Sequence, residues 1–251
     1  MKKKILIIGG HDPSGGAGVM MDANICRLNE CHPLTLITSE TVQNSQKSKD
    51  NFPATEEVFK KQLDFILDDI KPDAIKIGLI GSYEIARVIK NVLVKTKMPV
   101  VIDPVIGPTS GKSFLNNKTI EFMRDELLPL ASIVTPNEDE LLKLGNKNNL
   151  ENSIKFLYEL GIKNTLVTGK IKNNKIVNYL FSDGCDPLQF KNHLLKGNFH
   201  GTGCMLSSLL TIFLAKKFSV VDSCEKASNQ TNSYLKLFLS LIHISEPTRP
   251  C

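Results

Sequence analysis

The feature that most constrains the fold is an alternation of short apolar segments with longer amphipathic ones. Runs rich in β-branched residues recur along the chain, and most are separated by stretches with apolar residues three or four positions apart, such as EEVFKKQLDFILDD (56–69) and YEIARVIKNVLVK (83–95). The first pattern is typical of buried strands, and the second of helices that cover a sheet. This alternation predicts an α/β fold with a central, mostly parallel sheet and helices on both of its faces.

The second half of the chain departs from strict alternation. Three apolar segments follow one another with short polar links: NTLVTG (164–169), KIVNYLF (175–181) and LQFKNHLL (188–195). We expect antiparallel strands at one edge of the sheet, followed by two helices that complete the domain. Residues 1–240 are predicted to form a single domain. Residues 241–251 break the preceding helical pattern, so we expect a disordered or non-native tail.

Composition excludes several classes of protein. The chain is 41% hydrophobic and 23% charged, with a net charge of +5 and scattered lysines, so nothing favours nucleic-acid binding. No apolar run approaches the ~20 residues needed to span a bilayer, so no membrane association is expected. Six cysteines without a Cys-x-x-Cys pair argue against a disulfide scaffold and a zinc site, and fit a reducing cytoplasm.

The stretch IGPTSGKS (106–113) imitates a P-loop, the phosphate-binding loop of many nucleotide hydrolases. That loop needs four residues between its first glycine and Gly-Lys-Ser/Thr, because its backbone N–H groups must curl around a diphosphate. Here only three residues separate Gly107 from Gly111. We therefore interpret the stretch as a flap that follows the strand ending in DPV.

The segment GGHDPSGGAG (9–18) joins the first strand to a helix. Its glycines allow the backbone to approach a ligand closely, and Asp12 or Ser14 is expected to cap the helix. The segment is not a G-x-G-x-x-G dinucleotide fingerprint. From the residues alone, a tight strand-to-helix turn explains it as well as a ligand loop does.

A second segment, TPNEDELLKLG (135–145), has a capping-box pattern, with Asn137 followed three residues later by Glu140. A purely structural role as a helix start would explain it completely. The functional alternative is that both side chains face the strand ends, where a carboxylate can organise hydrated Mg²⁺ near phosphates.

A third segment, residues 198–218, predicts a helix from about Gly203 to Lys216 with a regular apolar stripe. Residues 201–204 (GTGC) then form its N-terminus, where free N–H groups and the helix dipole favour an anion. The same field is expected to favour the thiolate of Cys204. The alternatives are a small buried core residue at Cys204 and, for His200, either a base or a neighbour of the helix start.

Together these segments resemble the ribokinase-like superfamily, and within it the hydroxymethylpyrimidine/phosphomethylpyrimidine kinases of thiamine biosynthesis. The resemblance extends to about residue 240, and the words that carry it are DPSGGAG (12–18), TVQNS (41–45), KIGLIGS (76–82), VIDPV (101–105), TPNEDE (135–140) and HGTGC (200–204). It implies a cytoplasmic homodimeric enzyme that transfers the ATP γ-phosphoryl group to a hydroxymethylpyrimidine and then to the phosphate formed.

The resemblance also implies roles by position. Contacts with the pyrimidine fall on Ala17, Asp22, Gln43, Leu79 and Val105. The residues expected to act in catalysis are Gly201, Thr202, Gly203 and Cys204. Cys204 occupies the position at which many superfamily members carry an aspartate base. The residues expected to bind Mg²⁺-ATP are Asp103, Asn137, Glu140, Thr168 and Gly169, and Asp103 and Glu140 are the expected metal ligands.

The chain departs from the family where two lysines are usual. The family's Lys-Ser-Gly and Lys-Gly-Gly read Thr-Ser-Gly (109–111) and Thr-Gly-Lys (168–170), so Lys112 and Lys170 are candidate replacements as ATP contacts. This departure leaves a catalytically silent pyrimidine-binding sensor as one alternative. A pyridoxal kinase is the other, because both substrates are planar nitrogen rings that carry a hydroxymethyl group. Gln43 and the GTGC motif favour the pyrimidine, and the retained polar residues of the strand ends favour an enzyme.

Overall fold

The computed structural model describes residues 2–44, 48–107, 113–147, 149–182, 184–195 and 199–245, with side chains to residue 237. In these ranges nine strands form one sheet in the order β3-β2-β1-β4-β5-β6-β7-β8-β9. The strands are β1 (Lys4–His11), β2 (His32–Gln43), β3 (Ser48–Pro53), β4 (Ala74–Ile77), β5 (Val100–Ile102), β6 (Ile133–Val134), β7 (Asn164–Lys172), β8 (Lys175–Ser182) and β9 (Leu188–His193).

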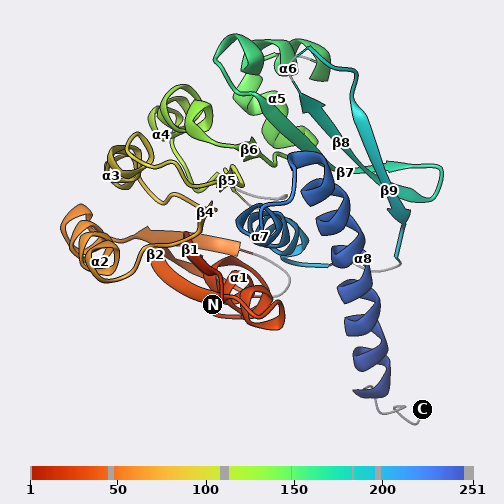
Figure 1. Ribbon diagram of the computed structural model, residues 1–251, viewed down its shortest axis with the longest axis horizontal. Helices are drawn as coiled ribbons and strands as arrows, with labels where there is room; N and C mark the ends of the chain where they lie inside the picture. The colour runs from red at the N-terminus through yellow and green to blue at the C-terminus, as the bar shows by residue number, and fades with distance from the viewer. Residues whose placement is uncertain are drawn as a thin grey trace.

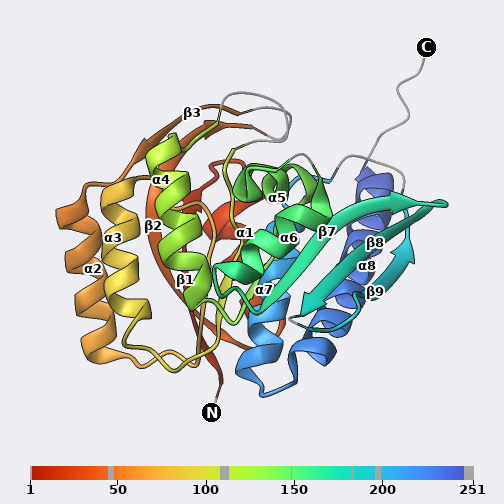
Figure 2. The same ribbon diagram turned by 90° about the horizontal axis from the view of Figure 1, so that it is seen from above.

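The six strands from β2 to β7 in this order run parallel, which confirms the predicted parallel centre. The predicted antiparallel edge is also present, as β7, β8 and β9. A second antiparallel edge strand, β3, pairs with β2 at the opposite end of the sheet (Figure 2). Its sequence, SKDNFP, is polar and largely exposed, so it lacks the apolar signal of a buried strand.

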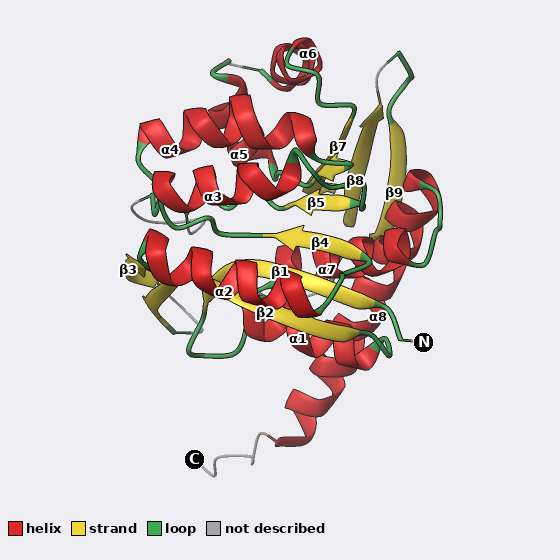
Figure 3. Ribbon diagram, turned by 60° about the vertical axis from the view of Figure 1, so that its left-hand side comes forward, coloured by secondary structure: helices red, strands yellow, loops and turns green. Residues whose placement is uncertain are grey.

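Helices cover both faces of the sheet (Figures 1 and 3). On one face lie α2 (Glu56–Asp69), α3 (Tyr83–Leu93), α4 (Asn117–Phe122), α5 (Glu138–Gly145) and α6 (Leu150–Glu159), with a π-helical turn (Met123–Leu127) and a 3-10 turn (Leu128–Leu130). On the other face lie α1 (Gly18–Leu28), α7 (Thr202–Ala215) and α8 (Val220–Ser245). In β1, Leu6 and Ile8 join the first core, whereas Ile5 and Ile7 join the second, so this strand is apolar throughout.

The predicted tail differs from what the structure shows. Helix α8 continues to Ser245, and its last turns project away from the rest of the chain (Figure 1). Residues 241–245, which we expected in the tail, are therefore helical. The segment LIHI (241–244) contains neither proline nor glycine, so the helix can continue through it. Residues 246–251 lie outside the described ranges, and the domain boundary stays a prediction.

No helix in the described part of the chain is both long and apolar enough to cross a membrane.

Helix α2 offers a direct test of the core beneath α2 and α3. Phe59 is fully buried there, whereas Phe65 on the same helix is 82% exposed. We expect Phe59→Ala to lower the free energy of unfolding by about 3–5 kcal/mol, because it leaves a cavity in a close-packed core. Phe65→Ala is the matched control and should change it by less than about 0.5 kcal/mol. Urea denaturation followed by circular dichroism measures both values, and equal losses would contradict the placement of α2.

Candidate active site

The loops that follow the parallel strands meet at one edge of the sheet and enclose a cavity of about 500 Å³. Because parallel strands point the same way, their carboxyl ends share an edge, and ligands of open α/β sheets bind there. The cavity is lined by most residues predicted for the site: Ala17, Asp22, Gln43, Leu79, Asp103, Val105, Asn137, Glu140, Thr168, Gly201, Thr202, Gly203 and Cys204. Gly169 does not line it, and Lys112 lies outside the described residues.

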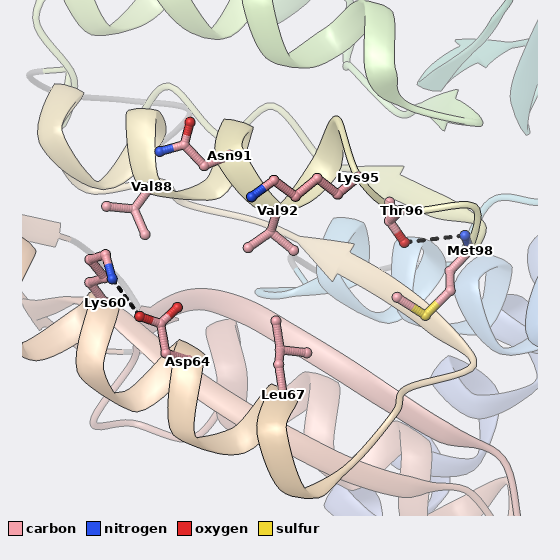
Figure 4. Close-up of a pocket in the computed structure, with 9 residues that line it drawn as sticks. All are labelled: Lys60, Asp64, Leu67, Val88, Asn91, Val92, Lys95, Thr96 and Met98. Carbon is pink, nitrogen blue, oxygen red and sulfur yellow. Dashed lines mark hydrogen bonds and ion pairs between the residues drawn. The ribbon is translucent and has the colours of Figure 1, made fainter.

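A second cavity, of about 450 Å³, lies between α2 and α3 (Figure 4). It contains an ion pair on the helix surface, between Lys60 and Asp64, and a turn in which Thr96 Oγ1 accepts a hydrogen bond from the backbone of Met98. None of the predicted site residues lines it. The cavity at the strand ends is therefore the candidate active site.

The loop after β1 is organised around Asp12, whose side chain is almost completely buried. Asp12 accepts hydrogen bonds from the backbone N–H of Ser14 (2.9 Å) and from its hydroxyl (2.8 Å), and its Oδ2 lies 2.9 Å from His200 Nε2. The expectation that Asp12 or Ser14 caps α1 is wrong: the N-cap is Ala17, without a side-chain cap. The reason is that the carboxylate of Asp12 is turned across the loop.

Two glycines allow close backbone contacts here: Gly18 with the end of β1, and Gly201 between the loops before α7 and before α1. Gly18 (φ +59°) and Gly201 (φ +80°) both adopt a left-handed conformation. A Cβ at Gly18 would lie 2.3 Å from the carbonyl oxygen of Gly10, and one at Gly201 would lie 1.9 Å from that of Gly16. Neither position can hold a side chain without moving the backbone, because those contacts are far below van der Waals distance.

Helix α7 begins at Thr202, one residue before the predicted start, with Gly201 as its N-cap. The first N–H groups of a helix have no acceptor within the helix, and the dipole adds partial positive charge there. Since residues 201–204 line the cavity, this helix start presents an anion site to it.

The thiol of Cys204 differs from the expectation. Burial, helped by the charges of Asp22 and Asp103 and opposed by that of Lys76, raises the pKa of Cys204 to about 12. The prediction that the helix field favours a thiolate is therefore wrong. Burial and two neighbouring carboxylates, which the local helix pattern does not reveal, oppose ionisation of this thiol.

Beneath the cavity lies a buried ion pair that the sequence pattern did not predict. Lys76 Nζ lies 2.7 Å from Asp22 Oδ2, both side chains are 0–1% exposed, and Asp22 Oδ1 accepts a hydrogen bond from Ser208 (2.8 Å). Burial would lower the pKa of Lys76, but the neighbouring Asp22, Cys204 and Asp103 raise it, so this lysine carries a positive charge. The available signal was a lysine between two isoleucines of a buried strand, AIKI.

The predicted capping box of α5 is confirmed. Glu140 N–H donates to Asn137 Oδ1 (2.9 Å), and Asn137 N–H donates to Glu140 Oε2 (3.0 Å). Burial and the nearby charge of Asp103 raise the pKa of Glu140 to about 8. Asp103, at the end of β5, accepts a hydrogen bond from Ser207 (3.1 Å) and its pKa is also raised by burial.

Asp103 and Glu140 fit a divalent cation. Burial disfavours ionisation of both carboxylates, and the charge of Asp103 also disfavours that of Glu140, so a nearby positive charge would stabilise them. No group of three or more His, Cys, Asp or Glu side chains suited to a metal occurs among the described residues. Two carboxylates nevertheless suit Mg²⁺, which in nucleotide enzymes takes its remaining ligands from water and phosphates.

The turn at Thr168 differs partly from the prediction. Strand β7 does not end there but continues to Lys172, with a register shift between Val167 and Lys170. Thr168 lines the cavity and its N–H bonds to the carbonyl of Pro136, whereas Gly169 N–H bonds to Asn178 Oδ1 (3.0 Å). Lys170 does not line the cavity, and its Nζ lies 3.7 Å from Glu138 Oε2. The described geometry therefore favours Thr168, rather than Gly169 or Lys170, as a contact with the ligand.

The buried ion pair predicts a large penalty for removing one partner. We expect Lys76→Met to lower the free energy of unfolding by about 3–5 kcal/mol, because Asp22, whose pKa burial already raises, would lose the charge that stabilises its carboxylate in the interior. The double variant Lys76→Met/Asp22→Leu removes both charges and should recover most of that loss. Chemical denaturation of the three proteins measures it, and a single variant as stable as the double one would contradict a charged pair.

The raised pKa of Cys204 predicts low reactivity. At pH 8, iodoacetamide should modify the exposed Cys185 and leave Cys204 almost unmodified, because alkylation requires the thiolate. Modification of Cys204 should rise with pH as its thiolate fraction rises. Peptide mass spectrometry follows both sites in one sample, and equal rates at pH 8 would contradict a pKa near 12.

Comparison with known proteins agrees with this geometry. The sequence model described as phosphomethylpyrimidine kinase matches residues 12–249. The chain is 33% identical over 239 residues to a hydroxymethylpyrimidine/phosphomethylpyrimidine kinase of Aquifex aeolicus, covering 92% of this chain and 93% of that protein. It is 31% identical over 257 residues to a rice (Oryza sativa subsp. japonica) protein named "Probable thiamine biosynthetic bifunctional enzyme, chloroplastic"; the match covers 98% of this chain but only 46% of the rice protein.

Solved structures share the fold. A Bacillus subtilis pyridoxal kinase in complex with ADP superposes with a TM-score of 0.82 at 27% identity, over 91% of this chain and 90% of that one. A phosphomethylpyrimidine kinase of Clostridium difficile 630 superposes with a TM-score of 0.76 at 27% identity, over 95% of this chain and all of the other. The ribokinase-like fold is thus confirmed, and the chain belongs to the phosphomethylpyrimidine kinase family.

Proposed function

We propose that this chain transfers the γ-phosphoryl group of ATP to 4-amino-5-hydroxymethyl-2-methylpyrimidine, and then to the resulting monophosphate, as a step of thiamine biosynthesis. The observation that carries the proposal is that one cavity contains both the residues expected to contact a pyrimidine and the anion site at the start of α7. Family membership supports the same reaction. A cytoplasmic location and a homodimer stay predictions from the resemblance.

The ring is proposed to bind between apolar side chains and one amide. Leu79, which is buried, and Val105, packed against the core, offer apolar surface to a planar ring. Ala17 leaves room beside them because its side chain is a single methyl group. Gln43 can pair a donor and an acceptor with the ring nitrogen and the exocyclic amine of the ligand.

The phosphoryl group is proposed to lie at the N-terminus of α7 while it is transferred from ATP to the substrate. Backbone N–H groups of residues 201–204 stabilise its negative charge, which is the main requirement of a loose phosphoryl-transfer transition state. Asp103 and Glu140 would hold Mg²⁺, which when bound neutralises the charge of the ATP phosphates. Thr168 adds a polar contact at the same edge. Lys112, outside the described residues, remains the proposed substitute for the family lysine.

Cys204 is proposed to contact the attacking hydroxyl without being a resting thiolate. Because burial raises the pKa of Cys204 to about 12, its thiol is protonated near neutral pH. Because a loose transition state needs little proton removal before the phosphoryl group transfers, a protonated thiol is compatible with turnover. The proposed role of Cys204 is therefore to position the attacking hydroxyl of the substrate rather than to act as a general base.

Turnover tests the proposal. ADP release is measured with Mg-ATP and, separately, the hydroxymethylpyrimidine, its monophosphate and pyridoxal. We expect turnover with both pyrimidines and much less with pyridoxal. Turnover with pyridoxal alone would overturn the proposal in favour of a pyridoxal kinase, and tight pyrimidine binding without turnover would identify a sensor.

The variant Cys204→Ala tests the catalytic assignment in the same assay. We expect kcat to fall by about 10²-fold with a much smaller change in pyrimidine affinity, because the lost contact acts on the reacting hydroxyl. Cys185→Ala, on the exposed surface, is the matched control and should keep the kcat of the unaltered protein. An unchanged kcat in Cys204→Ala would remove the assignment.

A further inference from the structure

Strand β7 contains a β-bulge where it passes the cavity. The register of β7 on β8 shifts between Val167 and Lys170. Two residues of β7, Thr168 and Gly169, therefore lie opposite a single residue of β8, Asn178. A bulge of this kind bends its strand and changes the direction of a side chain, and bulges are frequent beside active sites. Since Thr168 lines the cavity, this bulge belongs to the candidate site.

The side chain of Asn178 replaces the hydrogen bond that the bulge removes from the ladder. The extra residue of a bulge is left unpaired by the neighbouring strand. Here the backbone N–H of Gly169 donates to Asn178 Oδ1 (3.0 Å), and Asn178 Nδ2 donates to Ser228 Oγ on α8 (3.1 Å). Asn178 is 7% exposed and does not line the cavity. Its amide therefore joins the bulge to α8 from behind.

Backbone contacts hold the bulge on its other side. Thr168 N–H donates to a carbonyl of the segment before α5 (2.9 Å), and Thr168 forms a parallel bridge with Asn137. Asn137 is the N-cap of α5 and shares the capping box with Glu140, one of the proposed Mg²⁺ ligands. Thr168 is thus held beside the capping box, with the start of α5 on one side and Asn178, acting through Gly169, on the other.

We propose that Asn178 is a positioning residue for the nucleotide, which fixes the bulge of β7 so that Thr168 contacts the phosphates of ATP. Without the amide, the N–H of Gly169 loses its acceptor and the bulge becomes free to move by one residue along β7. Such a move turns side chains toward the opposite face of the sheet, and the hydroxyl of Thr168 would leave the cavity. This inference rests on the proposed function, because it treats Thr168 as a contact with ATP.

The first experiment uses the unaltered protein and needs no variant to fold. Gly169 is exposed, so its backbone N–H is protected from solvent mainly by the hydrogen bond to Asn178. We expect this N–H to exchange with deuterium at least about tenfold more slowly than the same group in an unstructured peptide, the equivalent of one hydrogen bond. NMR spectroscopy of the ¹⁵N-labelled protein measures the rate, and a rate equal to that of the peptide would overturn the proposal.

The second experiment is a double-mutant cycle on nucleotide binding. Asn178→Leu removes the amide and keeps a side chain of similar size, and Thr168→Val removes the hydroxyl. Isothermal titration calorimetry measures the Kd of the Mg²⁺ complex of β,γ-methylene-ATP. We expect each variant to bind about tenfold more weakly, and the double variant to bind no more weakly than Thr168→Val, because Asn178 acts through Thr168. Independent losses, about a hundredfold in the double variant, would overturn the proposal.

The pyrimidine provides a readout that a merely structural role would move and a positioning role would not. The residues proposed to contact the ring lie on other elements of the fold. In Asn178→Leu the Kd of the hydroxymethylpyrimidine, measured without nucleotide, should therefore equal that of the unaltered protein. Equal weakening of the pyrimidine and the nucleotide would show general damage to the site and overturn the proposal.

Asn232→Leu is the matched control. Asn232 is 8% exposed, and its Nδ2 donates to the backbone carbonyl of His193 (2.9 Å), so it also joins α8 to the antiparallel edge of the sheet through an amide. It neither lines the cavity nor bonds to the bulge. We expect this variant to leave the Kd of the nucleotide unchanged. A tenfold loss in the control would contradict the specific role of Asn178.

These outcomes distinguish the inference from the function on which it rests. An unaltered protein that binds neither the nucleotide nor the pyrimidine would contradict the proposed function. A protein that phosphorylates the hydroxymethylpyrimidine, but whose Asn178→Leu variant binds the nucleotide with unchanged Kd, would leave the proposed function intact and contradict only the assignment of Asn178.

Discussion

The ion pair between Asp22 and Lys76 is the interaction on which the rest of the site depends. It joins α1 to the centre of the sheet at β4, and Ser208 extends the connection to α7. Charges this deeply buried persist only when paired and hydrogen-bonded, so the three elements are held at one separation. The cavity lies directly above, since both members of the pair line it. The start of α7 is thus placed relative to the strand ends by electrostatics as well as by packing.

Backbone contacts complete this arrangement. The loop before α1 and the loop before α7 approach so closely at Gly16 and Gly201 that no side chain fits between them, and Asp12 spans the same two loops through His200. The loop expected to hold a pyrimidine and the helix start expected to hold a phosphoryl group therefore form one unit. Such rigid placement is what phosphoryl transfer requires, because most of its catalysis comes from positioning and charge neutralisation.

Much of this was readable from the sequence, for identifiable reasons. Parallel strands buried on both faces are uninterrupted apolar runs, so the centre of the sheet could be predicted, whereas Asn137 and Glu140 were found by their capping-box pattern and Asp103 by the family resemblance. Strand β3 was missed because its residues are polar, and Lys76 because sequence does not reveal its partner 54 positions away. The state of Cys204 was mispredicted because a local helix field was considered without the burial and carboxylates that tertiary structure brings to it.

The central claim is that one cavity holds the pyrimidine and the nucleotide, with the phosphoryl group at the start of α7. A crystal structure with the hydroxymethylpyrimidine, Mg²⁺ and a non-hydrolysable ATP analogue tests it most directly. We expect the terminal phosphate to lie on the backbone N–H groups of residues 201–204 and the ring to lie against Gln43. A nucleotide or pyrimidine bound elsewhere, for instance in the groove between α2 and α3, with the strand-end cavity empty, would contradict it.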